Sequence, residues 1–150
     1  MAESLQLCTF SLGDRLFALP VSEVREVVRG LEVTGVPLAP EVVRGLANLR
    51  GQIATTVDLR RRLEMPPHPG PGADVNIVVE AADGLVCLMV DDIGDVIDVP
   101  ADSLARPPDT LRPQLRELVK GICRVDDSLV LLLDTSRAVD AGLARRAVAP

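Results

Sequence analysis

Few side chains in this sequence have the type and spacing that catalysis requires. The single histidine, His68, lies in Pro66-Pro-His-Pro-Gly-Pro-Gly72, a composition typical of a loop. A Ser-His-Asp or Cys-His site holds its imidazole rigidly, so a histidine in such a loop is a poor general acid or base. We predict that His68 has no catalytic role and no structural partner.

The three cysteines stand alone in apolar stretches. Cys8, Cys87 and Cys123 form no CxxC pair, and the chain has no second histidine, so the spacing that metal sites require is missing. We predict that all three are small buried hydrophobic side chains, that the protein holds no metal and no cofactor, and that it works in a reducing compartment.

Charged side chains offer two further candidate sites. Asp91 and Asp92 could serve a small carboxylate-dependent enzyme, but neighbouring residues of a strand point in opposite directions, which makes them a weak pair. The run Arg60-Arg61-Arg62 could bind an anion. Three consecutive residues of a helix also diverge, so the sequence favours a solvated arginine surface.

Composition excludes several classes of function. The chain has 150 residues, a formal net charge of -6 and 1% aromatic residues, so base stacking and general nucleic-acid binding are disfavoured. It has neither an apolar run long enough to span a membrane nor the pattern of a signal peptide. We therefore expect one globular domain over residues 1–150 in the cytoplasm, without insertion into a membrane.

The elements that must position any site form an internal repeat. When Asp14 is aligned with Asp83, Leu16 meets Leu85 and Val24 meets Ile93. Further along, a slightly longer offset places Gly51 on Gly121. The repeat predicts two similar subdomains, approximately 5–65 and 74–139, that could exchange strands, joined by a Pro/Gly-rich loop over 66–73.

Short β-branched runs separated by turns predict a mainly β fold, either a pair of small barrels or a sandwich. Expected strands lie near residues 5–12, 16–19, 24–28, 33–36, 53–57, 76–80, 85–90, 96–99 and 129–133. Proline and capping signals predict short helices over 40–49, 59–63 and 111–119, and another after Asp134 as far as Leu143. Asp58 is the expected cap of the helix over 59–63.

Four segments resemble the CheW family of chemotaxis coupling proteins. The most specific is Gly45-Leu-Ala-Asn-Leu-Arg-Gly51, which follows Pro37-Leu-Ala-Pro40. Residues 10–28, 90–96 and 118–134 carry the rest of the likeness, which extends from about Leu5 to Val139. Thr55, Thr56 and Cys87 depart from the family's pattern.

The resemblance implies a fold of two pseudo-symmetric, interlocked, five-stranded SH3-like β-barrels with a few short helices. It also implies a non-catalytic adaptor of two-component signalling. Such an adaptor couples the cytoplasmic tips of methyl-accepting chemoreceptors to the regulatory domain of the histidine kinase CheA. It is recruited to receptor arrays. A related alternative is a regulatory CheW-like module that normally acts with a receiver or kinase partner.

The resemblance also assigns roles to particular residues. Val24, Glu26 and Val27 lie on the element that family members present to partners, and their counterparts in the second half are Ile93, Asp95 and Val96. The alternative interpretation is that these aliphatic side chains belong to the hydrophobic core.

Arg50 completes the predicted partner surface. Its planar guanidinium suits a carboxylate, and Glu26 is the natural candidate for that partner. Gly45 and Gly51 are expected to serve backbone geometry, through a positive φ or a close approach, rather than direct contact.

Overall fold

The computed structural model describes residues 3–69, 75–81 and 84–139. The strands are β1 (Ser4–Leu12), β2 (Arg15–Pro20), β3 (Val24–Arg29), β4 (Val43–Leu49), β5 (Gln52–Asp58), β6 (Val75–Ala81), β7 (Gly84–Val90), β8 (Asp92–Pro100), β9 (Val119–Val125) and β10 (Ser128–Leu133). The helices are α1 (Leu59–Arg62), α2 (Pro113–Leu118) and α3 (Thr135–Val139), with 3₁₀ turns η1 (Val21–Glu23) and η2 (Ala101–Ser103).

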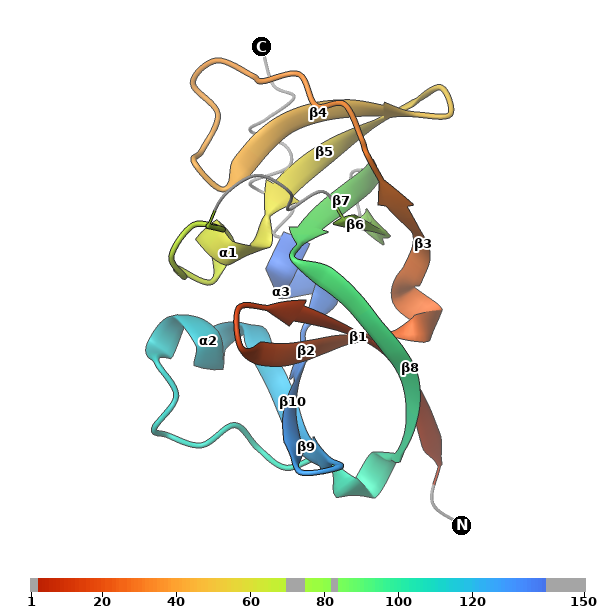
Figure 1. Cartoon of the computed structure of the whole chain (residues 1–150), viewed down its shortest axis with the longest axis vertical. Helices are drawn as coiled ribbons and strands as arrows, with labels where there is room; N and C mark the ends of the chain where they lie inside the picture. The colour runs from red at the N-terminus through yellow and green to blue at the C-terminus, as the bar shows by residue number, and fades with distance from the viewer. Residues whose placement is uncertain (1–2, 70–74, 82–83, 140–150) are drawn as a thin grey trace.

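The strands form two sheets with the same internal order. Sheet A runs β8-β1-β2-β10-β9 and sheet B runs β3-β6-β7-β5-β4, so replacing β1–β5 by β6–β10 converts one order into the other. Each sheet therefore takes strands from both halves of the chain, as Figure 1 shows with sheet B above sheet A. The predicted mainly β, two-part SH3-like fold is confirmed, although neither five-stranded sheet closes into a hydrogen-bonded ring.

Strand register confirms the first part of the repeat, in which Asp14 is aligned with Asp83. Val27 of β3 pairs with Ile77, and Val96 of β8 pairs with Cys8. Under the same alignment Val27 is the counterpart of Val96 and Cys8 is the counterpart of Ile77, so the two pairs are equivalent. A bulge interrupts both ladders just before these pairs, which kinks the two edge strands alike.

The second part of the repeat has a larger offset than the sequence predicted. Gly45 of β4 pairs with Thr56, and Gly121 of β9 pairs with Leu132, so the counterpart of Gly121 is Gly45. The predicted alignment of Gly121 with Gly51 is wrong, because the connection between β8 and β9 is longer than that between β3 and β4.

Alternating side chains give each sheet two buried faces. One face of each sheet packs into a central core, which contains Phe10, Phe17, Leu19 and Leu88, all with no exposed area. The other faces form two smaller cores. Core A, in sheet A, contains Leu7, Ala18, Val99, Cys123, Val130 and Leu132. Core B, in sheet B, contains Leu49, Ala54, Val78 and Cys87.

Two predicted elements differ from the structure. The segment predicted as a helix over 40–49 forms strand β4, whose buried and accessible residues alternate as pairing with β5 requires. Pro40 instead accepts a hydrogen bond from the amide of Val43 in a turn before the strand. The expected strand over 33–36 reduces to one bridge between Thr34 and Leu46. In both places tertiary pairing overrides a local signal.

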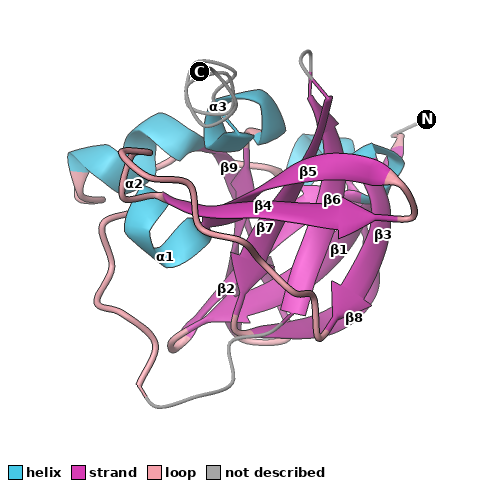
Figure 2. Ribbon diagram, turned by 90° about the horizontal axis from the view of Figure 1, so that it is seen from above, coloured by secondary structure: helices cyan, strands magenta, loops and turns pink. Residues whose placement is uncertain are grey.

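The three helices lie together at one side of the strands (Figure 2). Arginine side chains link them in a ring. Arg112, before α2, donates to the carbonyls of Leu63 and Glu64 after α1, and Arg62 of α1 donates to the carbonyl of Arg137. Arg137 in turn donates to the carbonyl of Glu117 in α2. Each helix end thus receives a cation from another helix, where the helix dipole favours it.

Helix boundaries agree in part with the sequence. Asp58 accepts from the amide of Arg61 and caps α1, as predicted, and α2 falls within the expected 111–119. The predicted extension of α3 over 140–143 and part of the 66–73 loop lie outside the described residues.

Candidate functional site

The turn between β4 and β5 presents Arg50. Arg50 and Gly51 have φ of 51° and 86°, as a two-residue type I′ hairpin turn requires. The side chain of Asn48 accepts a 2.8 Å hydrogen bond from the Gly51 amide and holds the turn. Arg50 donates through a guanidinium nitrogen to Oε2 of Glu26 on β3, which is the predicted ion pair.

This pair connects the two edges of sheet B. β3 and β4 are its terminal strands, so an ion pair from β3 to the β4–β5 turn spans the opening of the curled sheet. The Arg50 side chain is 77% exposed and that of Glu26 only 22%, so the guanidinium covers a partly buried carboxylate. A hollow of about 130 Å³ lies there, lined by Arg25, Glu26, Leu49, Arg50, Gln52 and Leu85.

Glu26 also reaches into core B. Its second oxygen, Oε1, is buried and has no hydrogen-bond partner. Burial, and then the charge of Glu26, raise the pKa of the Cys87 thiol to about 11. Cys87 is therefore a neutral thiol at physiological pH, and it lacks the thiolate that a nucleophile needs. Cys8 and Cys123 are likewise buried free thiols, as predicted, and burial raises the pKa of each.

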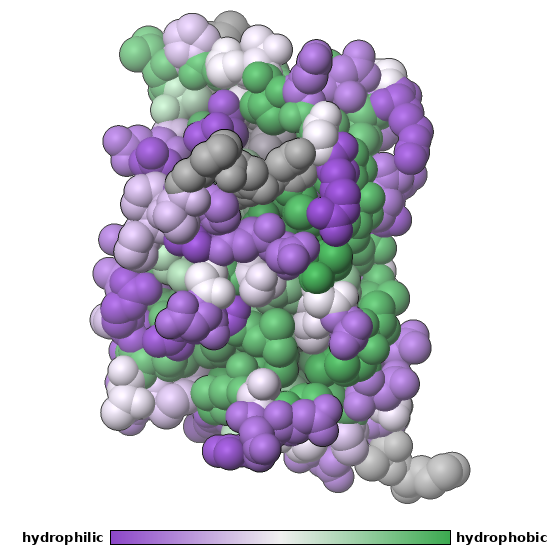
Figure 3. Space-filling model, in the orientation of Figure 1, coloured by the Kyte–Doolittle hydropathy of each residue, from purple (hydrophilic) through white to green (hydrophobic). Residues whose placement is uncertain are grey.

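The four predicted aliphatic site residues divide into two kinds. Val24 and Ile93 are partly buried and pack against the central core. Val27 and Val96 are 39% and 58% exposed, at matching positions of the edge strands β3 and β8. Hydrophobic side chains gather along the side of the molecule where β3 and β8 lie (Figure 3). Exposed aliphatic side chains repeated in both halves are the main surface signal of this fold.

The sequence did not predict several further aliphatic residues that are exposed in the structure. Ile53 and Leu129 are exposed at matching positions of β5 and β10, and Leu38 is fully exposed at the tip of the loop before β4. The sequence carried a signal for the first pair. Val57-Asp58 resembles Leu133-Asp134, and extending this alignment toward the N-terminus places Ile53 on Leu129.

The two glycines of the motif serve the backbone in different ways. Gly45 has φ of 149°, and a Cβ there would lie 2.1 Å from the carbonyl oxygen of Thr34. Only glycine therefore lets the loop after β3 approach β4. Gly51 has open space around it, and its positive φ belongs to the turn that carries Arg50.

Arg60 differs most from its prediction. It is buried, not solvated, and donates from Nε and Nη2 to the two oxygens of Asp91 at 2.8 and 2.5 Å. The amide of Gly13 donates to the same carboxylate at 2.7 Å. The hydrogen bonds from Arg60, and more weakly the Gly13 amide and the charges of Arg60 and His68, hold the pKa of Asp91 below its usual range, although burial opposes them.

This arrangement also argues against Asp91 and Asp92 as a catalytic pair of carboxylates. Asp91 is fully engaged in tying α1 to the β1–β2 turn, and Asp92 lies near Arg29 instead, at 3.9 Å. His68 interacts with Asp91, so the prediction that it lacks a structural partner is wrong. Arg61 remains largely exposed, as predicted for the run.

The described residues lack two features. Within 3–69, 75–81 and 84–139, no three His, Cys, Asp or Glu side chains are grouped to hold a metal ion. No helix in the same residues has both the length and the apolar character needed to cross a membrane.

The duplicated strand order, the interlocked sheets and the exposed aliphatic residues on matching edge strands define a class of protein, the pseudo-symmetric two-sheet SH3-like scaffold. Comparison with known sequences specifies the class further. A family model described as a CheW-like domain matches residues 6–142, nearly the whole chain. The chain belongs to the CheW-like family of chemotaxis scaffold proteins.

Individual relatives agree with this assignment. The chain is 29% identical over 129 residues to the chemotaxis protein CheW of Rhizobium meliloti, covering 86% of this chain and 83% of the relative. It is 28% identical over 136 residues to that of Treponema pallidum, covering 88% and 80%. The crystal structure of the scaffolding protein TtCheW from Thermoanaerobacter tengcongensis superposes with a TM-score of 0.79 at 29% identity, covering 88% and 90%.

Proposed function

We propose that this chain is a non-catalytic adaptor that couples the cytoplasmic tips of chemoreceptors to the regulatory domain of the histidine kinase CheA. The observation that carries the proposal is the matching exposure of Val27 and Val96 on edge strands of a CheW-like fold. Solvating two aliphatic side chains at equivalent positions has no benefit for an isolated protein, whereas a partner that covers them recovers the free energy of burial.

The partner surface comprises Val24, Glu26, Val27, Arg50, Ile93 and Val96. In this proposal Val27 and Val96 make the apolar contact, and a receptor tip, which is a helical hairpin, lays an aliphatic stripe against them. Val24 and Ile93 support the exposed pair from the partly buried positions of the same strands. The Glu26–Arg50 pair orients the surface of sheet B and leaves guanidinium donors free for a partner.

The proposal includes a cellular setting and a domain organisation. The protein acts in the cytoplasm at receptor arrays, and its net charge of -6 fits neither nucleic-acid binding nor attraction to an anionic membrane. Residues 1–150 act as one domain, with subdomains 5–65 and 74–139 held together by the strands that each contributes to the other's sheet.

Reconstitution with receptor signalling fragments, CheA and ATP tests the proposal. Val27→Asp and Val96→Asp should fold normally, because both side chains already face solvent, yet lower receptor-dependent kinase output at least about tenfold, as loss of a central apolar contact does. Leu38→Asp is the matched control, an exposed aliphatic residue outside the surface, and should behave as wild type.

Sedimentation of the complexes separates the alternatives. Wild-type protein should bring receptor and kinase down together, whereas binding to a kinase or receiver partner without receptor would favour the regulatory module. Full kinase activation by both valine variants, or an equal loss with Leu38→Asp, would remove the partner surface from the proposal.

A further inference from the structure

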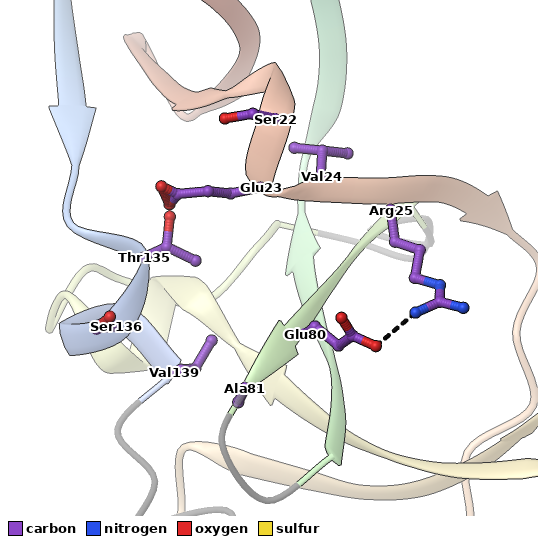
Figure 4. A pocket seen from close by; sticks show the side chains of 9 residues that line it. All are labelled: Ser22, Glu23, Val24, Arg25, Glu80, Ala81, Thr135, Ser136 and Val139. Atoms are coloured by element: carbon purple, nitrogen blue, oxygen red, sulfur yellow. Dashed lines mark hydrogen bonds and ion pairs between the residues drawn. The ribbon is translucent and has the colours of Figure 1, made fainter.

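A cavity of about 580 Å³ lies where η1 and the start of β3 meet the end of β6 and helix α3 (Figure 4). Its lining includes Ser22, Glu23, Val24, Thr135, Ser136 and Val139. Its volume falls within the range of small-ligand sites, roughly 300–1,000 Å³. The partner surface proposed above uses only Val24 of this lining.

The pseudo-symmetry shows what fills the equivalent place in the other half. Helix α1 follows β5 as α3 follows β10, and each begins after an aspartate that accepts from an amide three residues on. Arg60 of α1 therefore corresponds to Ser136 of α3. The Arg60 guanidinium is buried and held by Asp91 of the other half, whose counterpart in the repeat is Ser22.

Two serines thus replace a buried arginine and its carboxylate. Serine is far shorter than arginine, so Ser22 and Ser136 line an open cavity where Arg60 and Asp91 form a filled junction. The apolar floor persists, because Val139 is buried like its counterpart Leu63.

The cavity also contains a buried polar atom without a hydrogen-bond partner. The hydroxyl oxygen of Thr135 is buried in a residue only 7% exposed, and it has no hydrogen-bond partner. The counterpart of Thr135 is Leu59, which needs none. Figure 4 shows the Thr135 hydroxyl and the Glu23 carboxylate pointing toward one another from α3 and η1.

Charge selects the class of ligand. Glu80 is neutralised by Arg25 at 2.5 Å, whereas Glu23 enters no ion pair within the described residues. A cation is thus favoured over an anion or a neutral group. A threonine oxygen and a carboxylate that line the same cavity offer acceptors to a flat donor with several N–H groups, which describes guanidinium better than ammonium.

We propose that this cavity binds an arginine side chain of a partner protein, as the equivalent junction between the two halves holds the chain's own Arg60. The guanidinium donates to the Glu23 carboxylate and to the Thr135 hydroxyl oxygen. The aliphatic stem packs against Val24 and Val139. The inference is independent of the proposed receptor and kinase partners, because it concerns a site and a side-chain chemistry.

Titration of the isotopically labelled full chain with N-acetyl-arginine amide, followed by NMR, tests the site. Amide shifts should appear at Ser22, Glu80 and Ser136, and the lysine analogue at equal ionic strength should bind more weakly. Glu23→Gln should weaken arginine binding about tenfold or more, as loss of a charged hydrogen bond does. Unchanged affinity in Glu23→Gln, shifts outside the cavity, or equal binding of lysine would overturn the proposal.

Rebuilding the junction gives a second measurement. The double variant Ser22→Asp with Ser136→Arg supplies the missing pair from within the chain and should abolish probe binding. It should also melt at a higher temperature than the two single variants predict by addition, because the new groups couple as Arg60 and Asp91 do. Undiminished probe binding to this variant would show that the probe binds elsewhere.

A separate experiment tests whether the arginine comes from a partner, because the chain itself carries Arg145 and Arg146 after Val139. The full chain with Arg145→Ala and Arg146→Ala should bind the probe with wild-type affinity. Binding that appears only in this variant would mean that the chain's own arginine competes for the cavity, and would overturn the assignment to a partner.

Discussion

Cores A and B occupy the same place in two equivalent sheets, yet their chemistry differs. Core A is formed by aliphatic residues and Cys123. At the positions of Leu7 and Leu132, sheet B has Asn76 and Thr56, and each of these buried side chains has an oxygen without a hydrogen-bond partner. The duplicated backbone therefore tolerates interiors of different chemistry in its two sheets.

The edges of the two sheets also differ in charge. Sheet B has the Glu26–Arg50 pair across its opening, whereas the counterparts in sheet A are Asp95 and Asp126, two acids that cannot pair. An aliphatic core stabilises sheet A by burial alone. Sheet B has fewer buried apolar side chains, and it carries an exposed guanidinium at its mouth where sheet A has two carboxylates.

Removing the junction that distinguishes the two halves should have the largest effect. Arg60→Met leaves Asp91 without its partner and should lower the free energy of unfolding by about 3–5 kcal/mol, since a buried charge is then uncompensated. Denaturant titration measures the change. The control is Arg61→Met, an exposed neighbour, which should cost less than about 1 kcal/mol. Equal losses in the two variants would contradict the structural role of Arg60.

The matched glycines of β4 and β9 should respond differently to the same change. Gly45→Ala places a methyl group 2.1 Å from a carbonyl oxygen at φ 149° and should cost about 3 kcal/mol. Gly121→Ala meets its nearest atom at 3.5 Å and should stay within about 1 kcal/mol of wild type. Thermal unfolding of the two variants gives the comparison, and a tolerant Gly45 would mean that the loop after β3 moves freely.

Acid should weaken the Arg60–Asp91 junction selectively. Because the pKa of Asp91 is lowered in the folded protein, its contribution to stability is complete above about pH 5 and is lost as pH falls below the ordinary aspartate value of about 3.9 toward the folded pKa. The stability difference between wild type and Asp91→Asn should therefore shrink on acidification. Asp92→Asn, at an exposed position, should track wild type, and a pH-independent difference for Asp91→Asn would refute the linkage.

The smallest effect on stability should come from the pair at the mouth of sheet B. Arg50→Ala should change the free energy of unfolding by about 0–1 kcal/mol, because its side chain is largely exposed, yet assembly with receptor and kinase should fail. Charge reversal of Glu26 or Arg50 alone should impair assembly, and reversal of both should restore part of it. Asp126→Ala, at the equivalent turn, is the control. Normal assembly by Arg50→Ala would remove Arg50 from the functional surface.

The sequence by itself determined the features that depend on nearby residues. Hydrophobic alternation indicated the β class, the repeat matched Val24 with Ile93, and Asp58 marked the start of α1. The chemistry of arginine and the motif over 45–51 led to the Glu26–Arg50 pair. In each case short-range geometry, or a side chain with one preferred kind of partner, restricted the outcome.

Tertiary structure decided what depends on which distant segments meet. It made a strand of residues 43–49, because β5 supplies a pairing partner for each of them except Arg44. It also buried Arg60, which sequence rules for a short helix place in solvent, because Asp91 approaches from the other end of the repeat. Packing also distinguished the two equivalent junctions. Arg60 fills one of them, whereas Ser136 leaves the other open, because this exchange changes the side-chain volume without changing the local sequence pattern.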